Sequence, residues 1–145
     1  MTASSANKAV DTPIGDSMTR GVLGGLAGGI VFGMLMQMMG MIPMVAMMVG
    51  SESVAVGWLV HLAISAFIGI TFAVLFRERI ASIGAGVGYG VGYGVVWWVL
   101  GALIAMPAKL GMPIFAINST SLQSLMGHMI FGAILGGAVA ALARR

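Results

Sequence analysis

Four long apolar segments, separated by short polar connections, account for most of the chain. They cover residues 21–42, 54–75, 83–106 and 121–142, and each is at least 22 residues long. At about 1.5 Å per residue, a helix of that length reaches across the roughly 30 Å hydrocarbon core of a bilayer. The pattern therefore predicts an all-α integral membrane protein with four transmembrane helices.

The second and fourth apolar segments carry the same pattern, 67 residues apart. In each, a histidine begins a row of small residues that recurs at every fourth position, which places the row on one face of a helix. We therefore expect two tandem helix hairpins, residues 21–76 and 83–142. Because each repeat has two helices, both insert the same way up, and their pseudo-two-fold axis is predicted to run along the membrane normal. The rows are His61, Ser65, Gly69 and Ala73, and His128, Gly132, Gly136 and Ala140.

The first 20 residues are polar and are predicted to form a flexible cytoplasmic tail before a single transmembrane domain of residues 21–145. The apolar run that follows the tail is too long for a cleaved signal peptide. Most cations fall on the same side of the membrane as the tail, and Lys109 alone falls on the other side. A positive-inside bias then puts both termini of this multi-pass protein in the cytoplasm. The cations on the inner side are Lys8, Arg20, Arg77, Arg79, Arg144 and Arg145.

Rows of small residues mark the faces where helices are expected to pack. Hydrocarbon gives no hydrophobic drive for helix association, so close approach of two backbones at small residues takes its place. Residues 84–94 have glycine at every second position, which would suggest a strand in a soluble protein. A lone strand leaves its backbone unpaired in lipid, so a helix with two GxxxG rows is predicted instead. The predicted packing residues are Gly21, Gly25, Gly29, Gly33, Ser65, Gly69, Gly132 and Gly136.

Composition narrows the classes of function. Hydrophobic residues make up 59% of the chain and charged residues 8%, whereas soluble domains carry about 25% charged residues. The seven Lys and Arg are too few and too scattered to form a nucleic-acid surface. The four acidic residues lie in the tail and the connections, so no pair of carboxylates for acid–base catalysis is expected within the membrane. The chain has no cysteine, so thiolate metal sites are excluded.

His61 and His128 are the first candidates for chemistry. Both are predicted to lie at one depth, and in a cyclic four-helix arrangement the second and fourth helices are diagonal neighbours. Two inward imidazoles at equal depth suit axial ligation of haem b, or a shared metal ion. Ionisable groups inside membrane segments are functional hypotheses by default. The preferred interpretation is nevertheless structural, because a neutral histidine on a small-residue face also fixes packing through a hydrogen bond.

Eight methionines lie at the end of the first apolar segment and in the connection after it. Thioethers are soft ligands that suit Cu(I), and Met34, Met38 and Met41 are predicted to share one helical face. The second repeat has only Met106 and Met112 at the comparable place. Methionine is also an adaptable apolar filler. Filler is the preferred interpretation, and a Cu(I) site is the alternative.

Four stretches carry a resemblance: GWLVHLAISAFIG (57–69), AMPAKLGMPIF (105–115), SLMGHMIFGAILGG (124–137), and the glycine-rich helix with Tyr89, Tyr93, Trp97 and Trp98. They resemble a group of small prokaryotic inner-membrane proteins that show the same tandem pattern of a histidine followed by small residues in their second and fourth helices. That group has no assigned reaction. The resemblance therefore implies a four-helix inner-membrane fold and no particular activity.

The sequence thus predicts a non-enzymatic protein of the inner membrane with a packing, accessory or assembly role. Its expected surroundings are the lipid bilayer and further copies of itself or other subunits of a membrane complex. The alternative hypothesis is a redox or metal-handling protein that binds haem or copper with the paired histidines. A small oligomeric transporter is the third hypothesis.

Overall fold

The fold is that of a computed structural model, which describes residues 13–145. Within these residues all regular structure is helical. Four stretches are long and apolar enough to cross a membrane: Ile14–Met38, Val54–Phe76, Ile83–Leu110 and Ser119–Leu142. This confirms the predicted all-α membrane fold with four spans. In chain order the elements are α1 (Ile14–Met38), α2 (Ile42–Met47), α3 (Val54–Phe76), α4 (Ile83–Trp97), the π-helix η1 (Trp98–Ala105), α5 (Met106–Leu110) and α6 (Ser119–Leu142).

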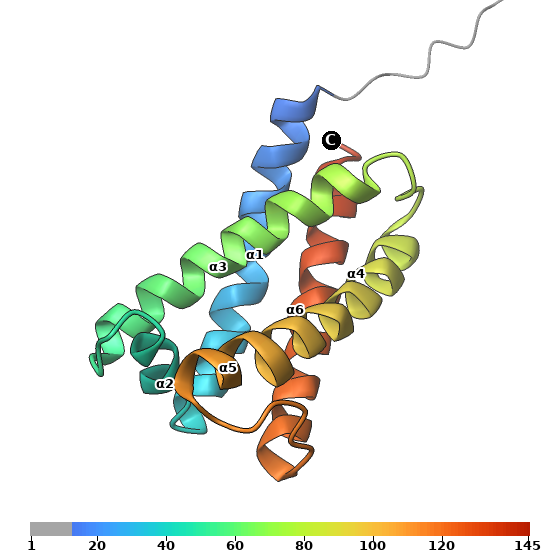
Figure 1. The fold of residues 1–145 in the computed structure, drawn as a ribbon. Helices are drawn as coiled ribbons and strands as arrows, with labels where there is room; N and C mark the ends of the chain where they lie inside the picture. Colours follow the sequence, from blue (N-terminus) through green and yellow to red (C-terminus); the bar gives the residue numbers. More distant parts are fainter. Residues whose placement is uncertain (1–12) are drawn as a thin grey trace, which may run out of the picture.

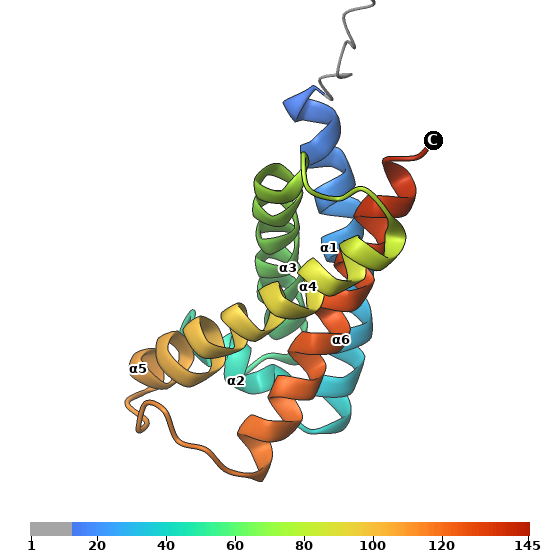
Figure 2. The ribbon, with the colours of Figure 1, turned by 90° about the vertical axis from the view of Figure 1, so that its right-hand side faces the viewer.

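Helices α1 and α6 pack against each other, α3 packs on α1, and α4 packs on α6 (Figure 1, Figure 2). The expected cyclic arrangement is looser on one side, because the backbones of α3 and α4 do not pack closely and aromatic side chains bridge them, such as Phe72 with Tyr93 and Phe76 with Tyr89. Beyond α4, in η1 and α5, the third span leans away from α6, as Figure 2 shows. The start of α1 and the C-terminus lie at one end of the molecule, and α2 and α5 lie at the other (Figure 1).

Small residues bring α1 and α3 into backbone contact. A Cβ atom on Gly21 would collide with the carbonyl group of Gly69, and one on Gly25 would collide with the carbonyl oxygen of Ser65. Any larger side chain at these positions would force the two backbones apart, so the interface depends on glycine. The α1 row consists of Gly21, Gly25, Gly29 and Gly33, and it faces Ser65, Gly69 and the ring of Trp58.

The same kind of contact joins α4 to α6. A Cβ atom on Gly90 would collide with the carbonyl oxygen of Gly132, and one on Gly132 would collide with that of Gly90. One of the two predicted glycine rows of α4 is therefore used within the chain. The other row is on the outside, since a Cβ on Gly88 or Gly92 would meet nothing within 4 Å. The packed row is Gly86, Gly90 and Gly94, opposite Gly136, Gly132 and the backbone of His128.

A second glycine row on α1, which the sequence reasoning did not single out, forms the contact with α6. A Cβ on Gly28 would lie 2.8 Å from the carbonyl oxygen of Phe131, and one on Gly24 would lie 3.1 Å from that of Leu135. Leu135 is completely buried. Because α1 carries glycine on two faces, it packs closely on two helices at once.

The first helix begins earlier than predicted. It starts at Ile14 rather than Gly21, so part of the predicted tail is helical. Pro13 precedes the first turn and Asp16 lies within it, and both positions favour a helix start at this point. The helix also ends at Met38, and Pro43 falls in the first turn of the separate helix α2. Residues 1–12 of the predicted tail lie outside the described part of the chain.

The third span changes its helical type halfway along. Pro107 has no N–H group, so the carbonyl oxygen of Leu103 lacks the usual intrahelical donor. It accepts instead the N–H of Phe115, at 2.9 Å. Phe115 adopts a left-handed conformation with φ of 54°, and this hydrogen bond ties the connection of residues 111–118 back onto η1. Helix α6 then begins with a capping box formed by Asn118 and Ser121.

One side-chain hydrogen bond links α3 to α4, and its removal gives a first testable prediction. Thr71 Oγ1 lies 2.7 Å from Tyr93 Oη and also 3.0 Å from the Ile68 carbonyl oxygen. Since the carbonyl can only accept, the tyrosine hydroxyl donates to Thr71. We expect Tyr93→Phe to lower the free energy of unfolding by about 1 kcal/mol, measured by thermal denaturation in detergent. Tyr89→Phe is the control, and equal melting temperatures for the two variants would contradict the prediction.

Candidate functional site

A cavity of about 620 Å³ lies where α3 and the third span separate. Phe32 and Met36 of α1 contribute to its wall, η1 and α3 form its sides, and α2, α5 and the start of α6 line one end. In the ribbon, these last three segments lie at the end of the molecule away from the C-terminus (Figure 1). The wall formed by η1 is π-helical, and π-turns are rare and frequently found at functional sites. Both predicted histidines line this one cavity.

His61 is held by the neighbouring helix. Its Nε2 lies 2.8 Å from the carbonyl oxygen of Gly29 on α1, and the residue is 7% exposed. A carbonyl oxygen has no proton to give, so Nε2 carries the hydrogen and donates it. In the neutral ring this leaves the lone pair on Nδ1. The hydrogen bond to a neighbouring helix that the structural interpretation expects is therefore present, and Nδ1 keeps its lone pair.

His128 is held differently, although it occupies the matching position in the second hairpin. Its Nδ1 lies 2.8 Å from the carbonyl oxygen of Ser124, one turn earlier on the same helix, and 3.4 Å from the Ser124 hydroxyl. By the same reasoning Nδ1 donates to the carbonyl and Nε2 keeps the lone pair. Within residues 13–145 the one fully buried, unpaired side-chain nitrogen or oxygen is Trp97 Nε1. Neither of the two free imidazole nitrogens is fully buried.

The ring of Phe32 contacts both histidines. Its centroid lies 5.6 Å from that of His61 and 4.7 Å from that of His128, with edge-to-face geometry in each case. A haem held axially by both imidazoles would need its plane between them, where this phenyl ring packs. The arrangement of the three rings therefore does not favour haem.

Six methionines line the cavity, and only one of them is among the three that the sequence singled out. Of those three only Met41 lines it, at 8% exposure, whereas Met34 and Met38 are 55% and 84% exposed on the outer face of α1. The shared face fails because α1 ends at Met38, and a turn at Gly40 with φ of 69° redirects the chain before Met41. The six are Met36, Met41, Met44, Met48, Met106 and Met112.

Met36 is the methionine that the sequence reasoning missed most clearly. It lies two residues from both Met34 and Met38, on the opposite side of the helix, and is 5% exposed. The signal was present, since Met36 continues the inward face through Gly29 and Phe32 at helical spacing. Met44, Met48, Met106 and Met112 come from α2, α5 and their ends, and only the tertiary structure brings them to one place.

The cavity is electrically neutral. None of its lining residues is an Asp, Glu, Lys or Arg. Across residues 13–145 no group of three or more His, Cys, Asp or Glu is placed to hold a metal ion. The Lewis bases that the cavity offers are therefore imidazole nitrogens, thioether sulfurs, and the hydroxyl and amide oxygens near the start of α6.

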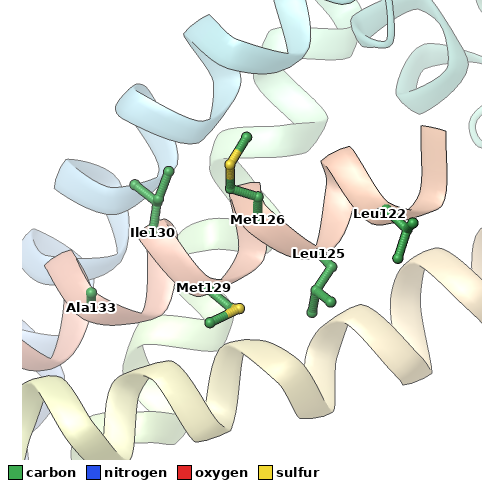
Figure 3. Close-up of a pocket in the computed structure, with 6 residues that line it drawn as sticks. All are labelled: Leu122, Leu125, Met126, Met129, Ile130 and Ala133. Carbon is green, nitrogen blue, oxygen red and sulfur yellow. The ribbon is translucent and has the colours of Figure 1, made fainter. Parts of the chain in front are cut away.

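A second, shallower groove of about 340 Å³ runs along α6. Figure 3 shows its side chains, of which Leu125 and Met129 point toward the neighbouring third span while Met126 and Ile130 point away from it. Its lining side chains contain only carbon and sulfur, so it offers no polar chemistry. We take it as a lipid-facing surface.

Comparison with protein-family models, with curated proteins and with solved structures finds no match to this chain.

Proposed function

We propose that the protein is a non-enzymatic integral membrane protein that binds monovalent copper inside the bilayer, in the cavity between α3 and η1. One observation carries the proposal: two histidines with a free ring nitrogen and six methionines line a single uncharged cavity. These residues come from distant parts of the chain. Thioether and imidazole ligands suit Cu(I) among the common biological metal ions.

The absence of charge from the lining residues supports a soft monovalent ion over other cations. Calcium and magnesium need several carboxylate or carbonyl oxygens, and the lining has no carboxylate. A divalent ion in a neutral, low-dielectric cavity would also carry a larger desolvation cost than a monovalent one. Cu(I) takes neutral soft donors and brings a single charge.

The hydrogen bonds of the two histidines support metal binding as well. A histidine that ligates a metal usually donates its other N–H to a carbonyl or carboxylate, which fixes the tautomer and the ring orientation. The carbonyl of Gly29 fulfils this for His61, and that of Ser124 fulfils it for His128. The free nitrogens, Nδ1 and Nε2 respectively, would be the ligating atoms.

The glycine rows lie outside the cavity and support this function by holding the helices around it together. They suggested an accessory or assembly role from the sequence, but most of them are used within the chain, where they hold α1, α3, α4 and α6 together. The row with Gly88 and Gly92 remains for lipid or for a further copy of the protein. The cation distribution supports an inner-membrane orientation with both termini in the cytoplasm, so that α2 and α5 lie at the periplasmic side.

The experiment that tests the proposal is titration of the detergent-purified protein with Ag⁺, an air-stable substitute for Cu(I), followed by removal of free ion and metal analysis. We expect close to one ion per chain. Met36→Leu is expected to weaken binding about tenfold or more, since leucine keeps the volume but removes the sulfur. Met38→Leu, on the outer face of the same helix, is the matched control. Failure of the wild-type protein to retain Ag⁺ overturns the proposal.

A second candidate function is the binding of a small apolar molecule. The observation that favours it is the mainly apolar lining, to which the ring of Trp97 contributes while its unpaired Nε1–H group is enclosed by protein atoms. A volume of about 620 Å³ also suits an organic guest. Mass spectrometry of the purified protein distinguishes the two, because this candidate requires a bound organic molecule and an Ag⁺ affinity that Met36→Leu does not change.

A further inference from the structure

The methionines of the cavity differ in exposure in a way that follows their position. Met112, in the connection after α5, is 47% exposed, whereas Met36 and Met41 are 5% and 8% exposed. Met44 of α2 and Met48, at its end, are half-buried. The sulfur-bearing residues therefore extend from the surface, at the end where α2 and α5 lie, to buried positions in the cavity that the histidines also line.

The outermost methionine is held in place rather than carried on a free loop. The N–H of Met112 donates to the carbonyl oxygen of Pro107 at 2.8 Å, directly after Gly111 ends α5 in a left-handed conformation. Three residues further on, Phe115 is hydrogen-bonded to Leu103 of η1. These two backbone hydrogen bonds fix Met112 at the cavity rim.

This inference rests on the proposed function. We infer that Met112 and Met48 form the outer part of an access route for Cu(I). Along this route the ion passes from the membrane surface to Met36, Met41 and the two histidines. At each step one copper–thioether bond forms as another breaks, and the ion keeps its charge and oxidation state throughout. Thioethers are weak, neutral donors, so none of the outer positions traps the ion. The imidazole nitrogens deeper inside complete the site and retain it.

Other lining residues near the rim do not offer an alternative path of the same kind. The exposed lining residues of the connection, such as Ala116, Asn118 and Thr120, carry no soft donor atom. No lining residue carries a charge that would attract a cation. Within the described residues, the route for a soft ion is therefore set by the positions of the sulfur atoms.

The test is the rate of Ag⁺ loading into the purified protein, followed by stopped-flow tryptophan fluorescence, with the equilibrium affinity measured in parallel. For Met48→Leu combined with Met112→Leu we expect the association and dissociation rates to fall together, by about tenfold, with the affinity nearly unchanged. Met34→Leu combined with Met47→Leu, two methionines that lie outside the cavity lining, is the matched control. An access route changes both rates equally because it lies on the path but not in the final site.

Two results overturn this inference while leaving the proposed function intact. Unchanged loading rates in the Met48 and Met112 variant mean that the ion enters elsewhere. A loss of affinity equal to the loss of association rate means that these two residues are ligands of the final site rather than a route to it. If the wild-type protein takes up no Ag⁺, the proposed function fails and the route fails with it.

Discussion

Gly90→Leu is expected to destabilise the protein by about 3 kcal/mol or more, whereas Gly92→Leu, two residues along the same helix, is expected to change the stability by less than about 1 kcal/mol. The reason is that side chains at these two positions would point to opposite faces of α4. A side chain at Gly90 meets the backbone of Gly132 on α6, which cannot move aside without separating the helices. A side chain at Gly92 meets nothing within 4 Å and extends into lipid.

The pair of variants is measured by thermal unfolding in detergent and by elution volume in size-exclusion chromatography. Both carry the same change in composition and in helix propensity, so a difference between them reports the packing of α4 on α6 alone. Equal destabilisation of the two proteins would mean that both faces of α4 are packed, and would place a second copy of the chain against Gly92. Equal stability would contradict the α4–α6 interface itself.

His128→Ala is expected to raise the dissociation constant for Ag⁺ about 100-fold or more while leaving the fold almost unchanged. The imidazole makes its hydrogen bond to Ser124 within its own helix, so its loss removes no hydrogen bond between helices and removes only the edge-to-face contact with Phe32 of α1. The substitution also removes the lone pair of Nε2, which is the proposed ligand of the metal ion. Met129→Leu, one residue away and outside the cavity lining, is the matched control.

The comparison with His61→Ala separates the two histidines. That substitution also removes the Nε2–H donor that bonds to the Gly29 carbonyl on α1, so we expect weaker Ag⁺ binding together with a loss of about 1 kcal/mol in stability. If His128→Ala binds Ag⁺ as the wild-type protein does, the imidazole is not a ligand. The structural interpretation of the histidines, which the sequence favoured, then stands.

The glycine rows show what a periodic sequence pattern can predict about helix packing and what it cannot. The spacing of Gly21, Gly25 and Gly29 identified a packing face without identifying what packs on it. The α4 glycines formed two equivalent rows in the sequence, and nothing in the spacing distinguished the packed row from the open one. Only the position of α6 makes that distinction.

The methionines show that helical spacing groups residues correctly only within one continuous helix. Helical periodicity grouped Met34, Met38 and Met41, but periodicity holds only while the helix continues, and the turn at Gly40 ends it. Met36 and Met112 are far apart in the chain and share no local pattern. Their common cavity results from the way in which α3 and the third span diverge.

The sequence by itself determined the helical membrane fold, the four spans and the small-residue faces. Helix length, apolarity and four-residue spacing are local properties, and an apolar segment in lipid must form a helix because its backbone polar groups have no water to bond to. The tertiary structure decided which faces meet, where the cavity lies and which donor atoms surround it. Those outcomes depend on contacts between residues distant in the chain. The same histidine pattern accordingly gives one imidazole bonded across to α1 and one bonded within α6.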